Sequence, residues 1–395
     1  MHYTSIVFYC LVGILISPSL SAFLPSSTRP LILSLILLTL LIATVLELRR
    51  SGYMIGSRIL ALSLSLVLLS VVSIINAQVG FDFRYFYLLG KCGVFFVAAY
   101  EFGKHGLDLS RINILIYIAT VVACLSVIGL FMSGGISAGE RYNFDQDSFS
   151  AVGLAINYSA VFLLMLFAAI RGVGLGAFIA FIASMTSACI VVFTASRGAI
   201  IAAGVSALLL SIINYRRVSG CQAVIIFLGS IFVYVGTPLK NQLQYVFKRF
   251  TYSEGQLGGF SSGRDTILAN YYHSWMDTAR SVMFGIADYD VGHYPHNIVI
   301  EILIRFGAFG AGLSFLFLLL FALDFYRNRC EIISSSLGQL LCVLFFYSLV
   351  LSMFNSSLEQ NFILFFSVGG LAGLFDANAS GDIKDVKSPH CSRVV

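Results

Sequence analysis

The sequence predicts an all-α fold: a polytopic membrane helical bundle of about 12 transmembrane helices, with a large outward-facing loop between helices 9 and 10. Of the 395 residues, 58% are hydrophobic and only 11% are charged, whereas a soluble domain carries about 25% charged residues. Apolar runs of about 20 residues, the length that crosses the hydrocarbon core, fill most of the chain. Lys and Arg favour alternate connections, as in proteins with cytoplasmic loops. These observations exclude a water-soluble enzyme.

The apolar runs place the spans in order along the chain. They are predicted at 5–24, 31–48, 59–77, 86–102, 112–133, 151–170, 174–194, 198–213, 221–237, 298–323, 332–354 and 361–376. No Lys or Arg precedes the first span, so we interpret it as an anchor and not as a signal peptide. The spans at 198–213 and 361–376 are short, which leaves eleven as an alternative count. We expect one integral membrane domain over 1–395, a loop at 238–297 and a tail at 377–395.

Basic residues predict the orientation. With the N-terminus inside, thirteen Lys and Arg residues fall in inward-facing segments and four, Arg29, Arg84, Arg141 and Arg197, fall in short outer loops. This asymmetry favours cytoplasmic N- and C-termini. The net charge of +5 reflects the same bias and does not indicate nucleic acid binding.

The eight cysteines all fall in predicted spans or inward-facing segments, without a CxxC pair. This distribution predicts neither a structural disulfide nor a zinc site.

The polar loop at 238–297 is the longest hydrophilic segment, and a loop of this length is usually functional. We expect two helices in it: a basic amphipathic one at 239–252, suited to the bilayer surface, and one at 264–282. Ile267, Tyr271 and Trp275 recur every four residues of the second helix and predict its apolar face. Two interpretations of these aromatics stay open, a belt at the lipid headgroups and a platform for sugar rings.

Arg197 lies at the outer junction of the seventh and eighth spans, in Thr194-Ala195-Ser196-Arg197-Gly198-Ala199. Charged side chains near the membrane interior tend to face a polar cavity or a partner, although snorkelling to the headgroups is an alternative. Arg suits phosphate because its rigid fork donates bidentate hydrogen bonds.

The segment before the tenth span contains Asp288, Asp290, His293 and His296. Metal binding by these residues is one interpretation, although their spacing matches no standard ligand pattern. A second is that a histidine acts as base or hydrogen-bond partner, because its pKa lies near working pH. The third is an ordinary solvated loop.

Glu301 and Arg305 lie four residues apart in the tenth span. Mutual neutralisation, which lowers the cost of insertion, is their simplest role. Glu301 is little more than one turn from His296, so lining the same cavity is the alternative.

Together these motifs resemble the O-antigen polymerase and O-antigen ligase superfamily. The resemblance rests on Arg197 in Ser-Arg-Gly-Ala, Arg264 in Ser-Gly-Arg, and His296 in Pro-His-Asn followed by Glu301 and Gly307. It implies a glycosyltransferase of the bacterial inner membrane, with the large loop in the periplasm, acting on sugars linked to undecaprenyl diphosphate without metal or cofactor.

The resemblance also implies roles for particular residues. Arg197 and Arg264 are expected to hold the diphosphate, and His296 to orient or activate the acceptor hydroxyl. Arg141 resembles the family's additional outer-loop arginines less closely. The expected substrate-binding residues are Arg141, Glu301, Trp275 and His293. The expected partners are the lipid-linked oligosaccharide, membrane lipids and, as a candidate, a chain-length regulator.

Three activities remain in competition. We favour a polymerase, which transfers the glycan to the next lipid-linked repeat unit, over a ligase, which transfers it to lipid A-core. A flippase is the rival from another class, but it is expected to carry charges along several spans, and most charges here lie at span ends or in loops. The absence of a Gly-rich nucleotide loop disfavours an ATP-driven pump.

Overall fold

The computed structural model describes the helical segments of the chain. The described residues are 3–20, 28–50, 83–105, 114–132, 151–172, 174–215, 241, 244–246, 264–286, 297–354 and 361–380. Every regular element within them is a helix, which agrees with the predicted fold class. The chain divides into two compact units, residues 1–43 with 107–252, and residues 44–106 with 253–395.

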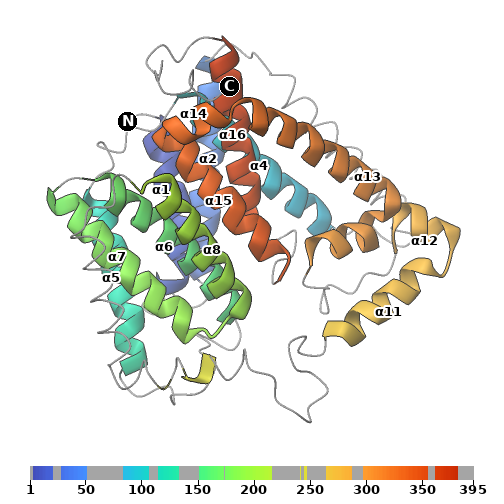
Figure 1. Cartoon of the computed structure of the whole chain (residues 1–395), viewed down its shortest axis with the longest axis horizontal. Helices are drawn as coiled ribbons and strands as arrows, with labels where there is room; N and C mark the ends of the chain where they lie inside the picture. The colour runs from blue at the N-terminus through green and yellow to red at the C-terminus, as the bar shows by residue number, and fades with distance from the viewer. Residues whose placement is uncertain are drawn as a thin grey trace. The chain divides into compact units, whose positions relative to one another are not determined.

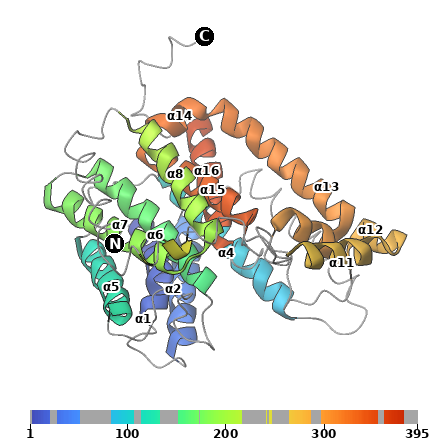
Figure 2. The same cartoon turned by 60° about the horizontal axis from the view of Figure 1, so that its bottom comes forward.

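The first unit contains helices α1 (Tyr3–Leu20), α5 (Ile114–Met132), α6 (Ala151–Arg171), α7 (Gly174–Phe193) and α8 (Arg197–Ile213). Most of α2 (Thr28–Arg50) belongs to it as well, and residues 44–50 of that helix belong to the second unit. The helix α6 is central, because α1, α7 and α8 all contact it, and α6 and α7 lie side by side in Figure 1 and Figure 2.

Small residues of α7 allow its close packing in this unit. Ala180 and Ala183 are fully buried, as are Ser184 and Ser187. The Ser184 hydroxyl donates to the Phe162 carbonyl of α6 at 3.3 Å, and Ser187 Oγ lies 3.3 Å from Cys124 Sγ of α5. Small and hydroxyl residues are the usual contacts between helices in a membrane.

The second unit contains helices α4 (Phe83–His105), α11 (Arg264–Met276), α12 (Ala279–Phe284), α13 (Ile298–Arg327), α14 (Arg329–Ser334), α15 (Ser336–Ser352) and α16 (Phe362–Ser380). The most extensive contact within it joins α4 and α16. Figure 1 and Figure 2 show α11 and α12 beside α13.

Glycines allow α4 and α16 to approach closely. A methyl group added at Gly103 would overlap the carbonyl oxygen of Gly370, and one added at Gly373 would overlap that of Tyr100. Gly369 and Gly373 are spaced as in the small-xxx-small pattern that brings membrane helices into backbone contact. Phe95 and Phe102 of α4 then pack their rings on Phe362 and Phe366 of α16.

Five described helices are long and apolar enough to cross a membrane, as in a multi-pass membrane protein. They are Leu31–Arg50, Val152–Arg171, Gly174–Phe193, Ile298–Arg327 and Phe362–Ala379. Four shorter apolar helices have 10–17 residues: Tyr3–Ser19, Ile114–Leu130, Arg197–Ile213 and Ser336–Ser352. Exposed Leu and Phe side chains on α2 and α13, such as Leu31 and Phe315, are compatible with a lipid environment.

Two of the predicted helices are each divided into two helices in the structure. The span expected at 332–354 is divided into α14 and α15, because the Ser335 hydroxyl accepts a hydrogen bond from the amide of Gly338 and caps the second helix. The loop helix expected at 264–282 ends at Met276, and Thr278 caps α12 through a reciprocal capping box with Ser281. The expected spans 59–77 and 221–237 and most of the helix at 239–252 lie outside the described residues.

The cysteine prediction was wrong at one position. Cys330 is disulfide-bonded, whereas Cys10, Cys92, Cys124, Cys189 and Cys342 form no disulfide. Residue spacing alone did not indicate this bond, because pairing depends on how the chain brings two thiols together.

Candidate functional site

Arg197 is the first residue of α8 and follows a tight turn. Thr194, Ala195 and Ser196 connect α7 to α8, and the Thr194 hydroxyl donates to the Val191 carbonyl at 2.7 Å. Ala195 has φ 50°, a left-handed conformation that non-glycine residues rarely adopt. Because Ala195 and Ser196 are also buried, the turn holds the start of α8 in a defined position.

The start of α8 is electrostatically suited to an anion. Ser196 stands at the N-cap without a side-chain capping bond, and the first turn of the helix contains no acidic residue. The N-terminus of a helix carries a partial positive charge and several unpaired amide hydrogens. The half-buried Arg197 adds a full positive charge there, opposite to the usual preference for acidic residues. Phosphate groups bind to this combination of amides and cation.

Arg264 is the first residue of α11, which lies within the segment 238–297 that is predicted to form the large loop. Tyr271 and Trp275 are half-buried, while Tyr272, His273 and Ser274 between them are exposed, so the predicted apolar face is the less exposed face at these two aromatics. The Tyr272 and Trp275 rings lie 6.2 Å apart. The indole Nε1 of Trp275 is buried and has no hydrogen-bond acceptor among the described residues.

Asn297 begins α13 and links it to α15. Its side-chain oxygen accepts hydrogen bonds from the amides of Val299 at 3.0 Å and Ile300 at 3.3 Å. Its side-chain amide donates to the Met353 carbonyl at 3.5 Å. The residue after the expected catalytic His296 is therefore anchored on two helices.

Glu301 and Arg305 form a buried ion pair in the first turns of α13. Arg305 Nη2 lies 3.0 Å from Glu301 Oε1, and the two side chains are 1% and 0% exposed. The predicted pairing is therefore confirmed, and Glu301 has no exposed surface in this structure.

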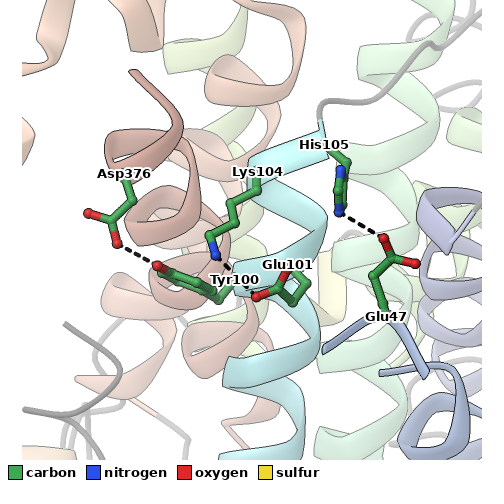
Figure 3. Close-up of polar contacts among 6 residues, drawn as sticks. All are labelled: Glu47, Tyr100, Glu101, Lys104, His105 and Asp376. Carbon is green, nitrogen blue, oxygen red and sulfur yellow. Dashed lines mark hydrogen bonds and ion pairs between the residues drawn. The ribbon is translucent and has the colours of Figure 1, made fainter. Parts of the chain in front are cut away.

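A second polar cluster surrounds the C-terminal end of α4 (Figure 3). The Tyr100 hydroxyl donates to Asp376 Oδ2 at 2.5 Å, and Lys104 Nζ lies 3.3 Å from Glu101 Oε1. His105 Nε2 lies 3.1 Å from Glu47 Oε1. Glu101 is only 1% exposed, and its second oxygen has no hydrogen-bond partner in the described part of the chain.

Sequence patterns alone did not identify this cluster. The feature that could have indicated it is the presence of two charged residues, Glu101 and Lys104, at the end of an otherwise apolar run. Glu47 and Asp376 come from distant parts of the chain, so only the packing of α4 on its neighbours reveals the cluster.

Several of the expected site residues lie outside the described part of the chain. Arg141, His293 and His296, together with Asp288 and Asp290, lie outside the described residues, and the side chain of Arg264 is not described. Arg197 belongs to the first unit and Arg264 to the second. Among the described residues, no group of three or more His, Cys, Asp or Glu could hold a metal ion. The metal interpretation of the segment 288–296 stays an untested alternative.

No family model matches the chain, and no curated protein matches it.

Proposed function

We propose that this protein is an O-antigen polymerase, a membrane glycosyltransferase that transfers a glycan from undecaprenyl diphosphate to the next lipid-linked repeat unit. One observation carries the proposal: a half-buried arginine at the N-terminus of α8, without an acidic residue in the first turn. A diphosphate complements both the helix end and the guanidinium. The motif resemblance around Arg197, Arg264 and His296 supplies the substrate class.

The proposal includes a membrane topology. About twelve spans cross a bacterial inner membrane, both termini lie in the cytoplasm, and the loop at 238–297 lies in the periplasm. Arg197 and Arg264 then lie on the periplasmic side, where lipid-linked repeat units are joined without nucleotide sugars. The thirteen basic residues assigned to the inner side support this orientation.

The proposed reaction is a substitution at the anomeric carbon of the donor sugar. The acceptor hydroxyl oxygen forms the new bond to that carbon, and His296 takes the hydroxyl proton. The bond between the anomeric carbon and the phosphate oxygen breaks, its electron pair stays on that oxygen, and undecaprenyl diphosphate leaves. Arg197 and Arg264 stabilise the developing negative charge, as fixed cations do in a water-poor site.

The aromatics of α11 extend this proposal to the glycan. Tyr271 and Trp275 lie on one half-buried face of α11, and the indole Nε1 of Trp275 is a donor without a described acceptor. We assign this face to the sugar rings of the substrate, with a headgroup belt as the competing role. Arg141 and His293 complete the proposed substrate-binding set.

Deleting the gene tests the activity directly. A polymerase deletion leaves lipid A-core capped by a single repeat unit, visible as one band above bare core in a lipopolysaccharide gel. Bare core together with accumulated lipid-linked polymer identifies a ligase instead. Loss of polymer formation on chelation of divalent cations would favour the metal interpretation of Asp288, Asp290, His293 and His296.

One observation favours a transporter as the second candidate. Glu101 is a buried carboxylate in α4, the helix at the predicted span 86–102, and one of its oxygens lacks a described partner. Buried carboxylates in membrane spans often mark ion or substrate paths. A Glu101→Gln variant that blocks substrate crossing, while Arg197→Ala and His296→Ala retain full polymer formation, would support transport and contradict the polymerase.

A further inference from the structure

The helix α13 is broken at a glycine. Gly307 has φ 63° and ψ −165°, so its backbone is not helical although α13 continues on both sides. The ribbon of α13 changes direction along its length in Figure 1. Where a membrane helix breaks, backbone groups lose their helical hydrogen bonds and need other partners. Here the segment after α12 supplies one such partner.

The backbone after α12 enters the break. The amide of Ile286 donates to the Ile304 carbonyl at 2.7 Å. Gly285 has φ 91°, and a Cβ atom added there would lie 2.5 Å from the carbonyl carbon of Arg305. One added at Gly307 would overlap the backbone of Met283. Glycines on both sides therefore allow the backbone after α12 to touch the backbone of α13, which any side chain would prevent. We call Gly285, Ile286, Ile304 and Gly307 the α12–α13 junction.

The buried ion pair flanks Ile304 of this junction. Arg305 contributes its backbone to the contact with Gly285 and its side chain to the pair with Glu301. A buried charge that loses its partner is strongly unfavourable. Replacing only one residue of the pair would therefore disturb the first segment of α13. The same segment begins at Asn297, beside the expected base His296.

We infer that Glu301 and Arg305 are positioning residues, which with the α12–α13 junction hold the first segment of α13 and the α11–α12 pair in one fixed arrangement. The inference rests on the proposed function and changes the role of Glu301. With no exposed surface, Glu301 does not touch the glycan. It fixes the start of α13, which follows His296 in the chain, and α11, which begins with Arg264.

A charge-swap experiment tests the pairing. The variants are Glu301→Arg, Arg305→Glu and the double variant carrying both changes, in the full chain purified in detergent. Each single change places two like charges together, so we expect a lower Tm and polymer formation reduced about tenfold or more. The double variant should recover Tm and most of the activity, although incompletely, because Glu before Arg is the better order along a helix.

Kinetics with a lipid-linked repeat unit separate positioning from substrate contact. Positioning residues predict a lower kcat with little change in the donor KM. Recovery of Tm without recovery of activity in the double variant would overturn the inference, because it would show that Glu301 or Arg305 contacts the substrate. No recovery of Tm would overturn the pairing itself.

Glycine variants test the junction with a control in the same helix. Gly307→Ala should lower kcat and Tm, whereas Gly312→Ala should change neither, because a Cβ at Gly312 meets no atom within 4 Å. Equal effects of the two changes would contradict the role of the junction. If the wild-type protein forms no polymer, the proposed function fails, and the Tm measurements still decide whether the pair and junction exist.

Discussion

Arg197 concentrates positive charge at a helix end that is already positive. Lysine would keep the net charge but not the two parallel donors of the guanidinium group. The strained residue Ala195 and the buried Ser196 hold the start of the helix in a defined position, which would preorganise Arg197 for the proposed diphosphate. Such preorganisation is the main source of electrostatic stabilisation of a leaving group.

The first prediction concerns the two arginines. Arg197→Ala should reduce polymer formation about 10²–10³-fold, the usual effect of removing one stabilising donor. Arg264→Lys should be nearly as damaging as Arg264→Ala, because a point charge does not reproduce bidentate geometry. The measurement is polymer length and amount in a lipopolysaccharide gel at matched protein levels.

The exposed Arg50 at the end of α2 provides the control, and Arg50→Ala should leave polymer formation unchanged. Full activity of Arg264→Lys would remove its role as a bidentate diphosphate ligand.

The second prediction concerns Glu331 in α14, whose Oε2 accepts a hydrogen bond from the side-chain amide of Asn378. Burial raises the pKa of Glu331 above its ordinary value. Because the pKa is raised in the folded state, Glu331 contributes most to the free energy of unfolding below its pKa in the unfolded chain, about 4.3. This contribution is lost as the pH rises through the pKa of the folded state.

Glu331→Gln should therefore raise Tm relative to wild type by a few degrees at most at neutral pH, with the difference disappearing near pH 4. Thermal unfolding in detergent across that pH range measures it. A lower Tm for the variant at neutral pH would show that the charged hydrogen bond to Asn378 outweighs the cost of burial.

At the scale of elements, glycines determine which helices touch. The contact between α4 and α16 and the junction between α12 and α13 both bring backbone against backbone. Close approach adds dispersion and weak Cα–H···O contacts, which replace the hydrophobic effect as a source of stability inside a membrane.

The third prediction tests the α4–α16 contact. Gly373→Ala should destabilise the protein by about 1–3 kcal/mol or more, the usual cost of overpacking, since the added methyl would overlap the Tyr100 carbonyl. Tm in detergent measures the effect. Gly90→Ala in α4 is the matched control, because a Cβ there meets no atom within 4 Å; an equal loss of Tm in both variants would contradict the close packing.

The polar cluster of Glu101, Lys104, Tyr100 and Asp376 joins the same two helices. Its three types of contact, an ion pair, a hydrogen bond and a cation–π contact of Lys104 with the Tyr100 ring at 4.5 Å, reduce the cost of placing charges beside apolar helices.

At the scale of the whole molecule, the topology is the fourth prediction. Alkaline phosphatase fused after Ser196 or Gly263 should be active, because both positions are proposed to lie in the periplasm. Fusions after Arg171 or Arg327 should be inactive with that enzyme and fluorescent with green fluorescent protein, because both positions are proposed to lie in the cytoplasm. The reverse pattern would invert the proposed orientation and remove the polymerase proposal with it.

Much of the helical architecture was predictable from hydropathy. The runs at 151–170 and 174–194 correspond to α6 and α7 within one residue at each end, because apolar length and helix length obey the same constraint in a membrane. Local capping was harder: the serines at 334–336 end one helix and begin another, inside what hydropathy presents as a single run. For the candidate site, the sequence predicted which residues take part but not their surroundings. Arg197 was identified, whereas the positive electrostatic potential of its helix end was not.

The sequence by itself determined the class of the protein, a helical membrane protein with few charges, and the pairing of Glu301 with Arg305, because both follow from neighbours along the chain. Only the tertiary structure decided that α13 breaks at Gly307, that Gly285 enters the break, and that Gly373 touches α4. The physical reason is that a glycine in the sequence shows only where the backbone has conformational freedom and lacks a side chain. Which second backbone occupies the space left by its missing side chain depends on segments far away in the chain.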